Sequence, residues 1–179
     1  MLISPSNSQI IQENNVYNMN LMKLVAVAAL AVGLSSVAVA QQVAKGQTEV
    51  LGFLGGITDG GGATLGGGLQ YGVQRRWLLS GELGWASGGK NSSLFTVDAN
   101  VHYLIPLKSN PKFTPYLLGG LGIIHGTNGG DTDAGLNLGG GARWAVGRDW
   151  GLRPEIKFLV ADNTSARFTI GIYKSFGRR

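Results

Sequence analysis

The sequence predicts an all-β fold, an eight-stranded antiparallel up-and-down transmembrane β-barrel, and three observations support this prediction. Glycine is abundant, with 30 among 179 residues, and only 14% of the residues are charged. Glycine disfavours helix interiors, so this composition argues against a helical bundle. Apolar residues alternate with small or polar ones at the period of two that is typical of strands. Turn-forming residues interrupt the alternation seven times, which leaves eight stretches of about ten residues.

The composition also excludes several classes of protein. Cysteine is absent, so a disulfide framework and a cysteine-ligated zinc or iron–sulfur site are excluded. The low charge content excludes a disordered chain. The net charge is +5 at pH 7, but lysine and arginine do not cluster among aromatic residues as they do on nucleic-acid-binding surfaces. We therefore expect no nucleic-acid partner and no cofactor.

The N-terminal segment predicts export. Lys23 precedes the apolar run 24–34, and Ala38 and Ala40 form an Ala-x-Ala cleavage site. We expect residues 1–18 to be an extension, residues 19–40 a signal peptide cleaved after Ala40, and residues 41–179 the barrel. An uncleaved membrane anchor is the alternative, although the apolar run is marginal in length for a spanning helix.

Seven turn signals divide the exported part. They fall at residues 59–61, 74–75, 87–89, 106–111, 127–133, 147–149 and 162–163. The first stretch fits the alternation least well, because Val50 and Leu54 lie on the face opposite most of its apolar residues. The second stretch has Gln70 on its polar face. The third and fourth alternate clearly and carry Glu82 and Asp98 on that face.

The last four stretches follow the same rule. The fifth is apolar on one face and rich in glycine on the other, which includes Gly120 and Gly122. The sixth has Asn137 on its polar face. We expect apolar residues at mid-strand to face lipid, namely Leu83, Val97, Leu121 and Ile170. Their inward neighbours are expected to be Glu82, Asp98, Gly120 and Thr169.

Charged residues are sorted between the two faces. Seven share the small and polar face, and we predict that they form a lumen network: Glu82, Asp98, Arg143, Arg153, Glu155, Lys157 and Arg167. Lys174 is the charged residue that lies on the apolar face within a stretch. A soluble barrel or sandwich, the alternative, would place its apolar face inside. We expect Arg143 and Lys157 to approach the level of Glu82 and Asp98 from across the lumen. At least two acid–base contacts within about 4 Å should form there, with Arg143 or Lys157 in one of them.

Aromatic residues on the apolar face gather near the ends of the stretches, as the aromatic girdles of membrane barrels do. One predicted girdle comprises Tyr71, Trp77, Tyr103, Phe113, Trp144, Trp150 and Phe176. The opposite girdle comprises Trp85, Phe95 and Phe168. A soluble core would scatter such residues along the strands, so the distribution favours a membrane barrel.

Over residues 47–177 the chain resembles the small outer-membrane β-barrel family of the OmpA/OmpX type. Local likenesses lie at residues 114–122 and at the closing segment 168–176, where Phe176 fits the terminal aromatic of an assembly signal and Lys174 departs from it. The resemblance implies a monomer in the outer membrane of a Gram-negative bacterium. Its partners would be outer-membrane lipid, lipopolysaccharide and the barrel-assembly machinery.

The resemblance also implies which end of the barrel faces the periplasm. With a periplasmic N-terminus, the periplasmic turns hold five basic residues, Arg75, Arg76, Lys108, Lys112 and Arg148. The outer loops hold four acidic residues, Asp59, Asp131, Asp133 and Asp162. The positive net charge is therefore expected to lie partly in a periplasmic collar.

The expected function is a structural, envelope-integrity or surface-interaction role, with the lumen plugged by salt bridges. A narrow porin-like pore for small solutes is the first alternative, and a lipid-modifying enzyme that uses His102 or His125 is the second. No Gly-x-Ser-x-Gly elbow is present, so we expect no enzymatic activity. Residues 127–135 lack the third ligand and the closing glutamate of an EF-hand, and we expect no metal site.

Overall fold

The structure is a computed structural model, and it describes residues 43–58, 61–88, 93–127, 132–162 and 164–177. The predicted extension 1–18, the predicted signal peptide 19–40 and its cleavage residues Ala38 and Ala40 lie outside the described residues. Within the described ranges, no helix is long and apolar enough to cross a membrane.

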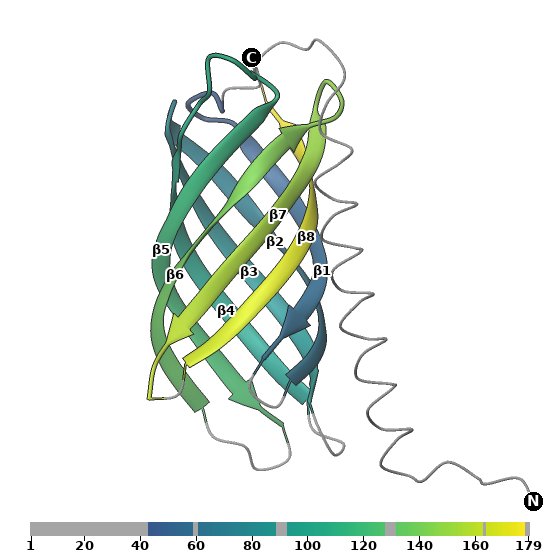
Figure 1. Cartoon of the computed structure of the whole chain (residues 1–179), viewed down its shortest axis with the longest axis vertical. Helices are drawn as coiled ribbons and strands as arrows, with labels where there is room; N and C mark the ends of the chain where they lie inside the picture. Colours follow the sequence, from purple (N-terminus) through teal and green to yellow (C-terminus); the bar gives the residue numbers. More distant parts are fainter. Residues whose placement is uncertain (1–42, 59–60, 89–92, 128–131, 163, 178–179) are drawn as a thin grey trace, which may run out of the picture. The chain divides into compact units, whose positions relative to one another are not determined.

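The predicted fold class is confirmed, because eight strands form a closed barrel in the order of the chain (Figure 1). Each strand pairs antiparallel with the next, and the first pairs with the last. The strands are β1 (Thr48–Ile57), β2 (Gly61–Gln74), β3 (Trp77–Gly88), β4 (Ser93–Leu104), β5 (Phe113–Gly126), β6 (Thr132–Ala145), β7 (Trp150–Val160) and β8 (Thr164–Phe176). The bounds of each predicted break agree with those of a connection to within three residues.

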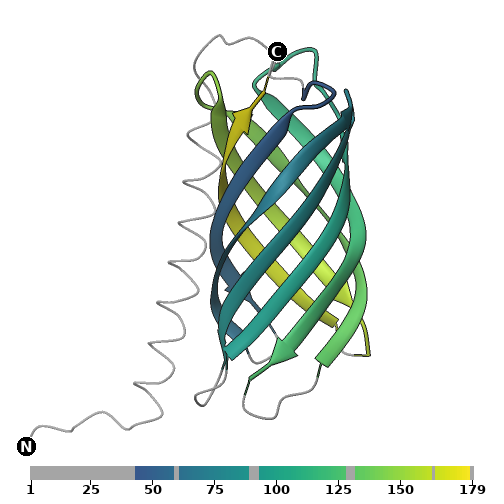
Figure 2. The same cartoon turned by 180° about the vertical axis from the view of Figure 1, so that it is seen from behind.

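The barrel has two ends that differ in their connections. We call the upper end in Figure 1 the turn end, and it holds connections 75–76, 105–112 and 146–149 together with the C-terminal end of β8. We call the other the loop end, where β1–β2, β3–β4, β5–β6 and β7–β8 are joined. Figure 2 shows from behind that all strands are tilted in the same sense relative to the barrel axis.

Side chains alternate between the two faces of the wall, as the sequence predicts. Leu83 and Leu121 are each 64% exposed on the outside, and Val97 and Ile170 are exposed with them. Their neighbours Glu82, Asp98 and Thr169 are buried inside, and Gly120 also has its inward side against the side chain of Asn100. An apolar exterior around a buried polar interior is the arrangement of a barrel in lipid.

Strand β1 differs from the sequence prediction. Val50 and Leu54 are exposed on the outside, whereas Leu51 and Phe53 are buried in the lumen. The majority apolar face of this strand therefore points inward. Leu51 and Phe53 fit inside because glycines on other strands face them and leave room for their side chains.

Phe53 illustrates this fit. A Cβ atom on Gly66 of β2 or on Gly84 of β3 would meet the tip of the Phe53 ring, and one on Gly171 of β8 would meet Leu51. Glycine on one strand thus makes room for a large apolar side chain on another. Interiors of small barrels are filled in this way by alternating small and large residues.

The lumen is not uniformly polar, which corrects the expectation of a polar interior. At the turn end a buried apolar cluster, which we call the cap, consists of Val43, Leu78, Leu104, Tyr116 and Leu118. Val43 is held there by the segment before β1. The Gly46 amide donates to the Gly72 carbonyl, and the Gly72 amide donates to the Gln47 carbonyl, both at 2.8 Å.

Candidate functional site: a charge network in the lumen

The candidate site is built from inward-facing residues on opposite walls of the barrel. Glu82 of β3 and Asp98 of β4 lie in register on adjacent strands. Lys157 of β7 and Arg167 of β8 are likewise in register. In a closed ring of eight strands, β3 and β4 lie opposite β7 and β8, so contacts between these pairs must cross the lumen.

Glu82 is the centre of the network. Its Oε1 atom accepts from Arg153 Nη2 at 2.7 Å, and its Oε2 atom lies 3.2 Å from Lys157 Nζ and 3.1 Å from Arg167 Nη2. All four side chains are buried. Three cations of β7 and β8 therefore converge on one carboxylate of β3.

Two further acids complete what we call the central cluster, which consists of Glu82, Asp98, Arg153, Glu155, Lys157 and Arg167. Asp98 Oδ2 lies 3.0 Å from Lys157 Nζ and 2.9 Å from Arg167 Nη2. Glu155 Oε2 lies 3.4 Å from Arg153 Nη2 and accepts from the Tyr116 hydroxyl at 2.8 Å. The Tyr116 hydroxyl thus joins the central cluster to the cap.

Arg143 belongs to a second group, contrary to the expectation that it reaches Glu82 and Asp98. Arg143 Nη2 lies 2.7 Å from Glu49 Oε1, and its Nη1 atom donates to Gln70 at 3.2 Å. The same Glu49 oxygen accepts from Ser175 Oγ at 2.8 Å. The Arg143 guanidinium also lies 4.0 Å from the centroid of the Tyr173 ring. We call Glu49, Gln70, Arg143, Tyr173 and Ser175 the rim cluster.

Among the residues that the structure describes, Glu49 is the buried charged residue of the lumen that sequence reasoning missed. It lies on β1, the strand whose faces the alternation misassigned, and its exposed fraction is 0%. Charge balance was a usable signal, because the seven predicted residues comprise three acids and four bases. With Glu49 the buried lumen carboxylates and cations are four and four, a difference of zero. Because an uncompensated buried charge is costly, this balance suits a closed interior.

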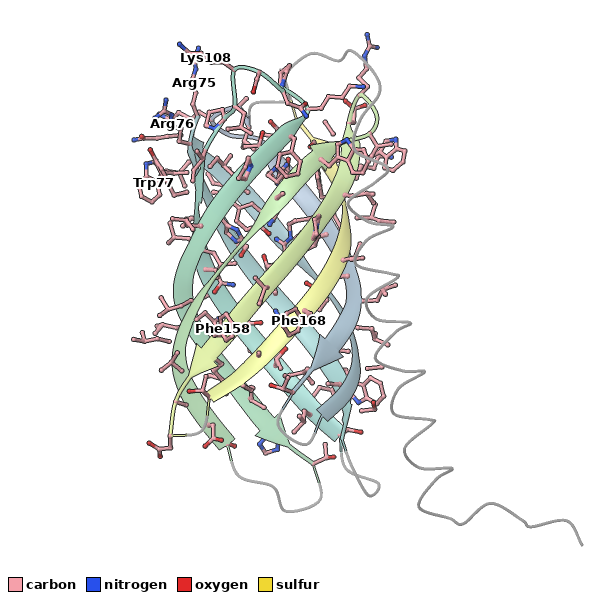
Figure 3. All side chains as sticks on the ribbon, in the orientation of Figure 1. Arg75, Arg76, Trp77, Lys108, Phe158 and Phe168 are labelled. Atoms are coloured by element: carbon pink, nitrogen blue, oxygen red, sulfur yellow. The ribbon has the colours of Figure 1, made fainter. Side chains whose placement is uncertain are left out.

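The predicted girdle residues form cross-strand pairs on the outer wall. Trp77 and Tyr103 are in register, with ring centroids 5.0 Å apart. Trp85 registers with Phe95 nearer the loop end. The other predicted girdle residues near the turn end are Tyr71, Phe113, Trp144, Trp150 and Phe176. Figure 3 shows Trp77 near the turn end, and Phe158 and Phe168 closer to the loop end. Phe158 was omitted from the girdle although its position on the outward face of β7 qualifies it.

The two histidines lie in different surroundings. His102 Nε2 is 2.8 Å from Ser80 Oγ inside the lumen, a pairing that sequence reasoning did not identify. His125 Nδ1 is 2.7 Å from Thr132 Oγ1 on the exposed surface. Among the residues that the structure describes, no group of three His, Cys, Asp or Glu side chains is placed to hold a metal ion.

Comparisons with known proteins agree with this geometry. The model of the outer membrane protein β-barrel domain family matches residues 27–172. The N-terminal β-barrel domain of OprF from Pseudomonas aeruginosa is 15% identical, with a TM-score of 0.56, over 74% of this chain and 98% of that one. Neisserial surface protein A is 16% identical, with a TM-score of 0.55, over 73% and 95% of the two chains.

A third similar structure comes from the de novo design of transmembrane β-barrels. It is 23% identical, with a TM-score of 0.55, over 76% of this chain and all of that chain. At such identities the likeness shows the shared fold alone. No curated protein matches the chain at a significant level.

Proposed function

Because the chain belongs to the outer membrane protein β-barrel domain family, we propose that it is a closed barrel with a structural role in the bacterial outer membrane. In this role it supports envelope integrity or presents its loops for surface interaction. The lumen serves as a polar core that holds the wall together. The convergence of Arg153, Lys157 and Arg167 on Glu82 carries this proposal.

The contacts of Glu82 act as a tie across the barrel. An eight-stranded barrel has an interior just wide enough for its side chains to fill. Here the filling side chains are charged, and each ion pair of Glu82 joins β3 to the opposite wall. Without Glu82, three cations would share two carboxylates and one buried positive charge would be uncompensated, so the network resists separation of the two walls.

The same contacts support a closed lumen rather than a pore. Every side chain of the central cluster, the rim cluster and the cap is buried except Ser175, whose exposure is intermediate. A solute would have to displace paired charges and the apolar side chains of the cap. We therefore favour the plugged barrel over the narrow pore.

Conductance in planar lipid bilayers tests the proposal. The folded protein is expected to insert without stable single-channel steps, and Glu82→Ala is expected to insert equally silently. Asp162→Asn is the matched control, because Asp162 is an exposed acid outside the lumen. Steady conductance of the unaltered protein would overturn the plugged barrel. Conductance that appears only in Glu82→Ala would identify the network as a gate.

We propose no catalytic role for the Ser80–His102 pair, the feature closest to an enzyme site. Ser80 is 6% exposed and His102 is 2% exposed, so a lipid substrate would need to enter a filled lumen to reach the hydroxyl. A lipid A acylation and deacylation assay tests this directly. Activity that is lost in Ser80→Ala, His102→Ala or His125→Ala would contradict the proposal.

A further inference from the structure

The outer wall over β2, β3 and β4 has an open hollow just below the turn end. Its volume is about 520 Å³. Outward residues line it: Thr48 at the start of β1, Leu69 and Tyr71 of β2, Leu79 and Gly81 of β3, and Ala99 and Val101 of β4. Apart from Thr48 the outward lining is apolar or glycine, and the hollow borders the aromatic girdle at Tyr71.

Small residues create the hollow. Gly81 is in register with Leu69 on one side and with Ala99 on the other. No heavy atom lies within 4 Å of a Cβ built on Gly81, so the space above it is open. Gly81 and Ala99 lie side by side and leave a gap in the outer wall, which leucine and valine side chains cover elsewhere around the hollow.

A basic rim stands directly above the hollow. Arg75 and Arg76 form the connection between β2 and β3, and Lys108 lies in the connection between β4 and β5. Figure 3 shows these three side chains at one corner of the turn end, with Trp77 beneath them. All three are exposed, and neither connection contains an acidic residue.

Contacts with the end of β4 fix the position of Arg76 in this rim. The Leu104 amide donates to the Arg76 carbonyl at 2.8 Å. Arg76 Nη1 lies 3.4 Å from the Tyr103 hydroxyl, and the Tyr103 ring packs against Trp77. Aromatic side chains of this kind sit at the level of lipid headgroups. The Arg76 guanidinium is thus held at headgroup depth, and Arg75 precedes it in the same connection.

We propose that the basic rim and the hollow together form a binding site for one anionic phospholipid of the leaflet at the turn end. The phosphate and the anionic headgroup lie against Arg75, Arg76 and Lys108. One acyl chain lies in the hollow over Gly81. The proposal goes beyond the structural role argued above and does not depend on whether the lumen conducts.

The dimensions fit a single lipid. Gly81 lies four positions after Trp77 along β3, a distance of about 13 Å along the strand. With the usual tilt of barrel strands, Gly81 lies about 10 Å below the aromatic level. The hydrocarbon core is about 30 Å thick, so one leaflet supplies about 15 Å. An acyl chain that starts at the rim therefore passes over the hollow within its own leaflet.

Native mass spectrometry of the folded protein tests the site. The protein is released from micelles that contain phosphatidylglycerol and phosphatidylcholine with identical acyl chains, and the retained lipids are counted. We expect one phosphatidylglycerol to be retained in preference to phosphatidylcholine. Inorganic phosphate at the same concentration should not displace it, because phosphate has no chain to occupy the hollow.

Two pairs of variants separate the parts of the site. Arg75→Gln/Arg76→Gln should weaken retention of phosphatidylglycerol by about fivefold for each lost cation. Its control is Arg148→Gln/Lys174→Gln, which removes two charges from the turn end beside β7 and β8. Gly81→Leu should abolish the preference by filling the hollow. Its control is Gly52→Leu, because Gly52 also faces outward with no heavy atom within 4 Å of its Cβ.

The heat-modifiable gel shift verifies that each variant is folded, and Ala99→Leu fills the same hollow should Gly81→Leu fail to fold. Equal effects of the test and control variants would mean general attraction of lipid to the barrel and would overturn the site. If the arginine variants lost phosphatidylglycerol but Gly81→Leu did not, or if inorganic phosphate displaced the lipid, the rim would bind anions in general. Either result would overturn the lipid assignment. Equal retention of the two lipids would also overturn it.

Discussion

At the scale of single residues, the lumen depends on mutual compensation of charges. Glu82 alone would be an unsolvated carboxylate in a filled interior, which is an expensive state. Its three cations would repel one another without it. The cost of burying each charged side chain therefore depends on the others. Loss of Glu82, which three cations share, is the most damaging single change in the central cluster.

Glu82→Ala is accordingly expected to destabilise the barrel. Breaking a buried ion pair by removing one partner typically costs about 3–5 kcal/mol. The measurement is the free energy of unfolding in phospholipid vesicles, supported by the temperature of the gel shift in detergent. Asp162→Asn, an exposed control, should change the free energy of unfolding by no more than about 0.5 kcal/mol. An unchanged stability of Glu82→Ala would contradict the role of the network as a structural core.

At the scale of elements, the strands are held at close range by glycines whose inward side has no free space. A Cβ on Gly120 of β5 would overlap the Ala99 carbonyl of β4 and the side chain of Asn100. Gly52 of β1 differs, because no heavy atom lies near its outward side. The two glycines therefore have different structural importance although both lie within strands.

Gly120→Ala should for this reason destabilise the barrel, whereas Gly52→Ala should not. Inserting a methyl group into a packed interior typically costs about 1–3 kcal/mol. Urea unfolding of both variants in vesicles provides the comparison. Equal unfolding midpoints for the two variants would show that the wall between β4 and β5 can move apart.

Outward positions should respond according to their depth in the membrane. Ile170 lies on the outward face of β8, at the mid-strand level predicted for the lipid core. Ile170→Arg should cost about 2–4 kcal/mol, as arginine does at the bilayer midplane. Val146→Arg, which alters an exposed residue of the β6–β7 connection, should cost at most about 1 kcal/mol. Similar costs at the two positions would argue against the assigned membrane level.

Strand positions and most faces could be predicted from the sequence because turn residues and alternation are local signals. In seven of the eight stretches polarity indicates which face points outward. On β1, polarity misassigned the faces, since Leu51 and Phe53 point inward against Gly171 and Gly66. Which neighbour leaves room for a large side chain depends on register between strands, and a local pattern does not contain that information.

Seven of the eight buried charged residues of the lumen were predictable from the sequence, but Glu49 and the division into two clusters were not. The inward face of β7 and β8 identified Arg153, Lys157 and Arg167, but the separate pairing of Arg143 with Glu49 depends on how strands distant in sequence meet. Their positions are 94 residues apart. The hollow over Gly81 was likewise beyond local reasoning, because it requires small residues in register on two strands.

At the scale of the whole molecule, the lumen is closed by layers that lie one after another along its axis. The cap and the rim cluster lie at the turn end, and the central cluster fills the interior below them. When two constrictions follow each other along a pore, the narrower one limits the ion current through both. Opening one layer alone therefore leaves the lumen closed, whereas each layer contributes separately to stability.

Val43→Ala tests this arrangement at the cap. Val43 is 1% exposed and packs with four other buried side chains, so truncating it should lower the free energy of unfolding by roughly 2 kcal/mol, near the lower end of core truncations. Val50→Ala removes the same atoms from an outward-facing valine of β1 and should have a much smaller effect. Both variants should remain silent in planar bilayers, because Arg143–Glu49 and the contacts of Glu82 are untouched. Stable channel activity in Val43→Ala would show that the cap alone closes the barrel, and the charge network would then lose its role as a plug.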